Sequence, residues 1–215
     1  MAASKNLIPA TWIAIIIYAV GLTGFLVPEL QQMVVGLTPV NILFAIFLAL
    51  IFHKKWDAPF VFAGLMIALC GWLLEVAGVH SGLIFGSYKY GKTLGYSVLE
   101  VPLILGANWF MLVYFTRSVV SGWFKDPAIV SVVAAAMMTG FDFLLEPVAM
   151  RFDFWSWKGN VIPLQNYIAW FIASLLIHYA YLKTVRISPN PMAGRLLFLQ
   201  AVFFAVLYFW VRAQG

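Results

Sequence analysis

Two carboxyl side chains stand four residues apart in a chain that is otherwise strongly apolar. Asp142 and Glu146 lie in the stretch GFDFLLEPVAMRFDFW (140–155), directly after the apolar run VVAAAMMT. On a helix, residues at this spacing share one face. A buried carboxylate is costly unless it is paired or protonated, so two of them on one face are expected to share a proton near neutral pH. Such a pair supports general acid and base catalysis.

Other polar side chains interrupt the neighbouring apolar segments. Glu75 lies in CGWLLEVAGVHSG, and the amides Asn108 and Asn166 lie within or at the start of apolar runs. We expect Glu75 to complete a polar cluster with the acid pair, and the amides to orient water or a carboxyl. The alternative for the amides is hydrogen bonding between helices. For the pair itself, the alternative is a structural ion cluster with Arg151 or Lys158.

Tryptophans fall on or close to the acidic segments, and these are Trp72, Trp109, Trp155, Trp157 and Trp170. An aromatic face stabilises a cation by roughly 0.5–2 kcal/mol, which would suit a carbocation intermediate. The alternative is that they contact lipid or form an interfacial belt.

The composition is that of an integral membrane protein. Of the 215 residues, 64% are hydrophobic and 10% are charged, whereas soluble domains typically carry about 25% charged residues. The net charge of +5 fits loop cations that face anionic lipid, and no basic run with interleaved aromatics indicates nucleic-acid binding. We predict one all-α domain over 1–215, a polytopic bundle of about seven transmembrane helices. The predicted spans lie near 10–27, 39–53, 59–79, 100–117, 128–146, 164–182 and 195–211.

The two longer connections, 80–99 and 147–163, are predicted to cap the same membrane face, which also carries the acids. Glu100, just before Pro102, fits an interfacial acid at the start of the fourth span. Counting cations on the two sides favours a cytoplasmic N-terminus, eight against five. The expected location is a bacterial or archaeal cell (inner) membrane.

Several kinds of site have no support in the sequence. The three histidines form no di-metal motif, no phosphate-binding or dinucleotide motif is present, and the seventh predicted span has no lysine for a retinal Schiff base. No metal or cofactor is expected. Acids, amides and aromatics remain, and they suit proton chemistry on an apolar molecule.

The motifs from about Trp72 to Trp170 resemble the membrane carotenoid 1,2-hydratase family. In order, they are E-x-x-G at Glu75, F-G-x-Y-x-Y with Tyr88 and Tyr90, V-P, D-x-x-x-E-P with the acid pair, W-x-W at 155–157, and P-x-x-N-Y-x-x-W with Asn166 and Tyr167. The resemblance implies a cofactor-independent enzyme that adds water to the terminal 1,2 double bond of an acyclic carotenoid such as lycopene.

Under this hypothesis Asp142, Glu146 and Glu75 are catalytic. The substrate-binding residues are Trp72, Tyr88, Tyr90, Asn108, Trp109, Trp155, Trp157, Asn166, Tyr167 and Trp170. The partners are the polyene, water and membrane lipid. A carotenoid cyclase or isomerase that uses the same protonation, and a carotenoid- or retinal-binding protein without activity, stay open as alternatives. The sequence leaves the oligomeric state, the substrate length and the proton donor undecided.

Overall fold

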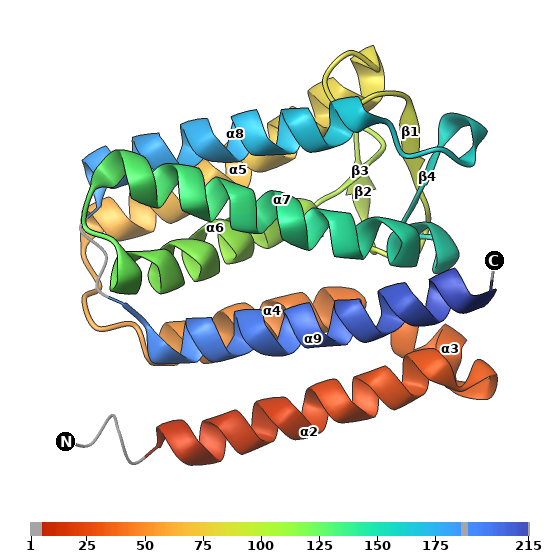
Figure 1. The fold of residues 1–215 in the computed structure, drawn as a ribbon, viewed down its shortest axis with the longest axis horizontal. Coiled ribbons are helices and arrows are strands. Elements are labelled where there is room, and N and C mark those ends of the chain that lie inside the picture. Colours follow the sequence, from red (N-terminus) through yellow and green to blue (C-terminus); the bar gives the residue numbers. More distant parts are fainter. Residues whose placement is uncertain (1–5, 186–188, 215) are drawn as a thin grey trace.

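The computed structural model describes residues 6–185 and 189–214, and these form a bundle of long helices (Figure 1). The α-helices are α2 (Leu7–Leu26), α3 (Pro28–Val35), α4 (Thr38–Ile51), α5 (Ala58–Ser81), α6 (Ile104–Trp123), α7 (Pro127–Arg151), α8 (Leu164–Thr184) and α9 (Pro191–Gln214). Each of the seven predicted spans is largely helical.

The starts of α5 and α7 follow from their sequences. Asp57 accepts a hydrogen bond from the backbone N–H of Phe60 at 3.0 Å, and Asp126 accepts two from the first turn of α7. A proline stands in the first turn of each helix, where its missing N–H costs nothing. Gly82 ends α5 in the left-handed conformation that glycine adopts readily. These caps fix where each acid falls along its helix.

By length and composition, four of the described helices could cross a membrane: α2, α5, α7 and α9. A fifth span is possible if α3 and α4, which meet at a bend of 60°, are taken together. Several apolar helices thus fit membrane insertion, but the predicted number of seven is not confirmed. α6 and α8 are long enough to cross a membrane but are not among these four.

The fourth predicted span begins later than expected. Residues 97–102 form a small hairpin of β2 (Ser97–Val98) and β3 (Val101–Pro102), and α6 follows at Ile104. Leu99 and Glu100 form its tip with positive φ values of 49° and 62°. The prediction that Glu100 stands at the start of a helix was therefore wrong, because Glu100 lies at the exposed tip of this hairpin.

The two long connections meet in a second sheet at one end of the bundle (Figure 1). β1 (Tyr88–Tyr90) pairs antiparallel with β4 (Trp155–Trp157), so that Tyr88 lies opposite Trp157 and Tyr90 opposite Trp155. Side chains alternate along a strand, and all four aromatic residues therefore share one face. The short 3-10 turn η1 (Lys158–Asn160) leads from β4 towards α8.

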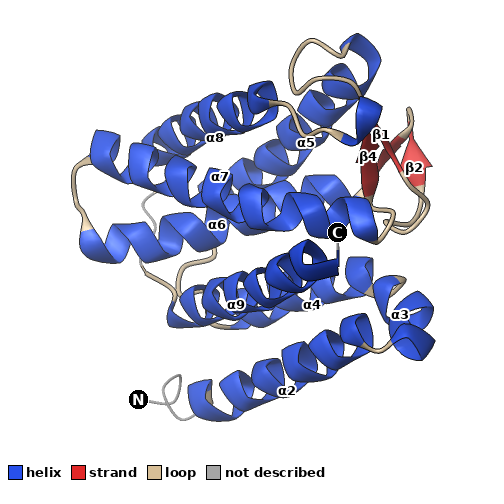
Figure 2. Cartoon of the chain, turned by 45° about the vertical axis from the view of Figure 1, so that its right-hand side comes forward, coloured by secondary structure: helices blue, strands red, loops and turns tan. Residues whose placement is uncertain are grey.

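Helix α6 lies inside the bundle. It packs against α4, α5, α7, α8 and α9, and most of its side chains are buried. α2 lies at the periphery against α3 and α9 (Figure 2). The side chains that α5, α6, α7 and α8 present towards the β1–β4 sheet can therefore meet at that end of the bundle.

Candidate active site

Glu146 is held by two indole N–H groups from β4. Trp155 and Trp157 donate to its Oε2 atom at 2.9 and 2.7 Å. The W-x-W spacing makes this possible, because alternate residues of a strand point the same way. An indole nitrogen can only donate, so this oxygen is held as a hydrogen-bond acceptor.

An amide separates the two acids of α7. Asn166, near the start of α8, donates from Nδ2 to Asp142 Oδ2 at 2.8 Å and to Glu146 Oε1 at 3.0 Å. All three side chains are buried. Asp142 and Glu146 thus lie on one face of α7, as expected. They do not contact each other directly, because the side-chain N–H groups of Asn166 bridge them.

Glu75 has its own set of donors. Tyr88 and Tyr90 donate to its Oε2 atom at 2.6 and 2.7 Å, and Trp109 Nε1 donates to Oε1 at 3.0 Å. Burial, followed by the negative charge of Glu75, raises the pKa of the Tyr88 hydroxyl, and the same two causes raise the pKa of Tyr90. Both tyrosines therefore stay protonated and keep donating.

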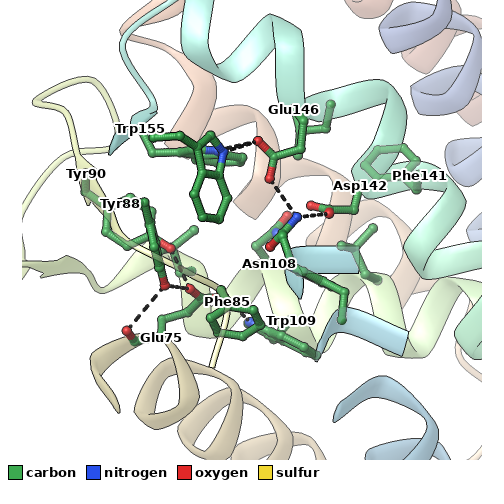
Figure 3. A pocket seen from close by; sticks show the side chains of 16 residues that line it. Glu75, Phe85, Tyr88, Tyr90, Asn108, Trp109, Phe141, Asp142, Glu146 and Trp155 are labelled. Carbon is green, nitrogen blue, oxygen red and sulfur yellow. Dashed lines mark hydrogen bonds between the residues drawn. The ribbon is translucent and has the colours of Figure 1, made fainter. Parts of the chain in front are cut away.

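The three acids line one small cavity between the helix ends and the β1–β4 sheet (Figure 3). Its volume is about 30 Å³, which is enough to hold a water molecule. In Figure 3, the two tyrosines lie at the left above Glu75, with Glu146 and Asp142 to their right. Trp109 and Trp170, which also line the cavity, stack with ring centroids 4.3 Å apart.

Most of the residues predicted to bind substrate line this cavity, and two do not. The lining ones are Tyr88, Tyr90, Asn108, Trp109, Trp155, Trp157, Asn166 and Trp170. Trp72 instead faces the β2–β3 hairpin, where its Nε1 lies 3.4 Å from Val101 O. Tyr167 packs beside Phe143, with ring centroids 5.7 Å apart. Neither side chain lines the cavity that holds the acids.

A second, much larger cavity adjoins the first, and sequence reasoning missed it. Its volume is about 500 Å³, and its walls come mainly from apolar residues of α2, α3, α4, α6, α7 and α9. We call it the apolar chamber. Five residues line both spaces: Leu105, Asn108, Phe141, Leu145 and Trp155. Apolar residues at helical spacing look the same in a sequence whether they pack or line a void.

The three carboxyl groups differ in how many donors they accept. Glu75 and Glu146 each accept three hydrogen bonds, distributed over both oxygens, which suits the ionised form. Asp142 accepts a single one, at Oδ2, among the described residues. Its Oδ1 atom is therefore the carboxyl oxygen in this site that is free to carry a proton.

The chain matches the model of a family described as "Carotenoid biosynthesis protein" over residues 36–214. It belongs to this family. It is also 26% identical over 120 residues to the bisanhydrobacterioruberin hydratase of Haloarcula japonica, a match that covers 50% of this chain and 39% of the relative. The chain thus spans well under half the length of that curated relative. No solved structure matches the chain.

The family match includes all three buried acids but begins after α2 and α3. Within residues 6–185 and 189–214, no group of three or more potential ligands could hold a metal ion. The ion pair found in this part of the chain joins Lys55 to Asp57, on the connection before α5. Arg151 is exposed, with its guanidinium 5.8 Å from the Phe152 ring. The described residues therefore do not form the ion cluster that was the alternative for the acid pair.

Replacing Gly71 with alanine should disturb the hydrogen bond that Trp109 donates to Glu75, because Gly71 lies one helical turn before Glu75 and contacts Trp109. A methyl group at Gly71 would overlap the Trp109 side chain, whereas one at Gly140 would meet nothing within 4 Å. We expect Gly71→Ala to displace the indole and lower activity at least about tenfold, with Gly140→Ala close to wild type. Enzyme assays on both purified variants test this, and equal activities would contradict it.

The raised pKa values of Tyr88 and Tyr90 predict how the free energy of unfolding depends on pH. Their folded-state pKa values are raised above the unfolded value of about 10, so the unfolded chain loses these protons first. Their contribution is full below pH 10 and is lost as the pH rises above it. Thermal unfolding should show this loss in the wild type and a smaller one in a Tyr88→Phe/Tyr90→Phe double variant. Equal losses in both proteins would contradict the prediction.

Proposed function

We propose that this protein is a cofactor-independent hydratase that adds water to the terminal 1,2 double bond of an acyclic carotenoid. Family membership supports action on carotenoids, and the relative in Haloarcula japonica carries the name hydratase. The observation that carries the proposal is a water-sized cavity lined by three buried carboxyl groups, which shares walls with a large apolar chamber. Hydration of an apolar alkene needs both spaces side by side.

The apolar chamber would hold the polyene. Its outer rim includes the exposed side chains of Ile16, Val20, Met33 and Val40, which belong to α2, α3 and α4. These residues would face lipid tails if the helices span a membrane, so the substrate enters sideways from the bilayer. The end group then reaches the shared walls at Asn108 and Phe141, with its double bond pointing at the acids.

Asp142 is the proton donor in this proposal. Its Oδ1 hydrogen adds to C2 of the terminal double bond, which leaves a tertiary cation at C1 and a carboxylate at Asp142. Asn166 holds the other oxygen of the group in place at 2.8 Å. A neutral carboxyl beside a fixed carboxylate is how one site keeps an acid and a base at the same pH.

Glu146 is the base that activates water. The oxygen of the trapped water forms a bond to C1, and the proton that it loses passes to Glu146, from which it returns to Asp142. The net reaction adds one water and consumes nothing else. The faces of Trp109 and Trp170 and the carboxylate of Glu75 would stabilise the cation before water adds.

The position of the cavity predicts on which side of the membrane hydration occurs. The β1–β4 sheet lies at the end of the bundle opposite the start of α2 (Figure 1). If the N-terminus faces the cytoplasm, as the distribution of cations predicts, the reaction takes place near the outer face of the cell membrane.

The test is the pigment profile of cells that make lycopene, with and without this protein. Mass spectrometry should find a product that is heavier by one or two waters. Unchanged mass with altered retention would instead support a cyclase or isomerase. Binding without any product would support a carotenoid-binding protein.

A further inference from the structure

Helix α9 places an amide with unused hydrogen-bonding capacity in the wall of the apolar chamber. Gln200 is 4% exposed and lines the chamber together with Tyr18 of α2 and Met111 of α6. Its Oε1 atom is buried and has no hydrogen-bond partner. By contrast, the hydroxyl of Thr38, which also lines the chamber, donates to Val35 O at 2.7 Å.

The hydrogens of the Gln200 amide are both used. Nε2 donates to Tyr18 Oη at 2.9 Å and lies 3.4 Å from Met111 Sδ. Because Tyr18 accepts here, its own O–H hydrogen is left over, and none of the hydrogen bonds found for residues 6–185 and 189–214 uses it. One donor and one acceptor therefore remain side by side in an apolar wall. Turning the amide over would pair Oε1 with Tyr18 but leave the N–H groups unpaired, so capacity remains in either orientation.

A hydrocarbon occupant would leave this capacity unused, and unpaired buried polar groups are costly. A hydroxyl group matches what remains, because it accepts from Tyr18 O–H and donates to Gln200 Oε1 at the same time. We propose that Gln200 and Tyr18 form a subsite for an aliphatic hydroxyl on the substrate. The preferred substrate is then an acyclic carotenoid that already carries a hydroxyl group, rather than a pure hydrocarbon.

The position of the subsite fixes where that hydroxyl lies on the chain. Asn108, in the wall shared by both cavities, and Met111, beside the Gln200 amide, are three residues apart on α6. At 1.5 Å per residue they are about 4.5 Å apart along the helix axis. The substrate hydroxyl therefore lies only a few carbon atoms from the double bond that reaches the acids. This inference about the substrate rests on the proposed function.

The test compares two acyclic polyenes that share the same terminal double bond, one with a hydroxyl group near that end and one without. Binding to the full chain in detergent is followed by quenching of tryptophan fluorescence, since Trp155 lines the chamber. We expect the wild type to bind the hydroxylated polyene roughly tenfold more tightly, as two hydrogen bonds to otherwise unpaired groups predict. Tyr18→Phe and Gln200→Leu should each bring that ratio close to one.

Tyr179→Phe is the matched control, because it removes the same hydroxyl from an exposed position on α8 and should keep the wild-type ratio. A wild-type ratio near one would overturn the subsite and leave the Gln200–Tyr18 pair with water as its partner. A preference that survives in both variants would place hydroxyl recognition elsewhere. Binding is measured without turnover, so a preference without a hydrated product would reject the proposed function and keep the subsite.

Discussion

Replacing Asp142 with asparagine should lower the hydration rate at least about a thousandfold while the helix bundle stays folded. General acid catalysis typically contributes 10²- to 10⁴-fold, and an amide cannot protonate an alkene. Asparagine keeps the shape of the side chain, and its carbonyl oxygen can still accept the hydrogen bond that Asn166 gives to Asp142. Steady-state rates of the purified Asp142→Asn variant on an acyclic carotenoid measure the effect.

Asp153→Asn is the control for this variant. Asp153 lies two residues beyond the end of α7 and is exposed, and its carboxylate accepts from the backbone N–H of Lys92 at 3.3 Å. We expect near wild-type rates from it. If Asp142→Asn retained more than about a tenth of wild-type activity, Asp142 would not be the proton donor.

Replacing Glu146 with glutamine should destabilise the folded protein by about 2–4 kcal/mol, more than Asp142→Asn does. Three N–H groups point at the two oxygens of Glu146. A glutamine amide nitrogen would face at least one of these donors, and the donor that loses its acceptor stays buried. At Asp142 a single donor is satisfied by the new carbonyl, so the cost is smaller. Denaturant or thermal unfolding of both variants gives the two free energies.

Glu29→Gln is the control, because it makes the same glutamate-to-glutamine change at an exposed position on α3. Its free energy of unfolding should stay within about 0.5 kcal/mol of wild type. A Glu146→Gln protein as stable as Asp142→Asn would contradict the view that Glu146 is held as a carboxylate by its donors.

The sequence predicted the helices well, because long apolar runs between prolines are strong signals. It also placed 80–99 and 147–163 at one end of the bundle, yet it did not predict that they pair. Tyr88 and Trp157 are partners from strands separated by a whole pair of helices, and three-residue strands carry no periodic signal strong enough to fix such a register. Glu100 shows the same limit, since a tight hairpin between apolar residues reads as the start of a helix.

The candidate site was predictable in its residue types but not in its connections. The i, i+4 spacing placed Asp142 and Glu146 on one face, and the intrusion of Glu75 into an apolar run marked it as costly. That Asn166 would bridge the first two depends on how α8 packs against α7, which no local pattern encodes. Tyr167 was expected at the cavity as the sequence neighbour of Asn166, but adjacent helical residues point in different directions. Trp72 stands one turn before Glu75, yet its indole N–H lies against Val101 O and the residue does not line the cavity.

The most direct measurement of the central claim uses purified protein, an acyclic carotenoid and water labelled with heavy oxygen. The account predicts one labelled oxygen on the product for each hydrated end. In a parallel reaction with labelled molecular oxygen and ordinary water, it predicts no label in the product. It also predicts that the Asp142→Asn protein binds the polyene but incorporates no label. A product of unchanged mass, or an oxygen that comes from molecular oxygen, would contradict hydration and with it the roles assigned to the three buried acids.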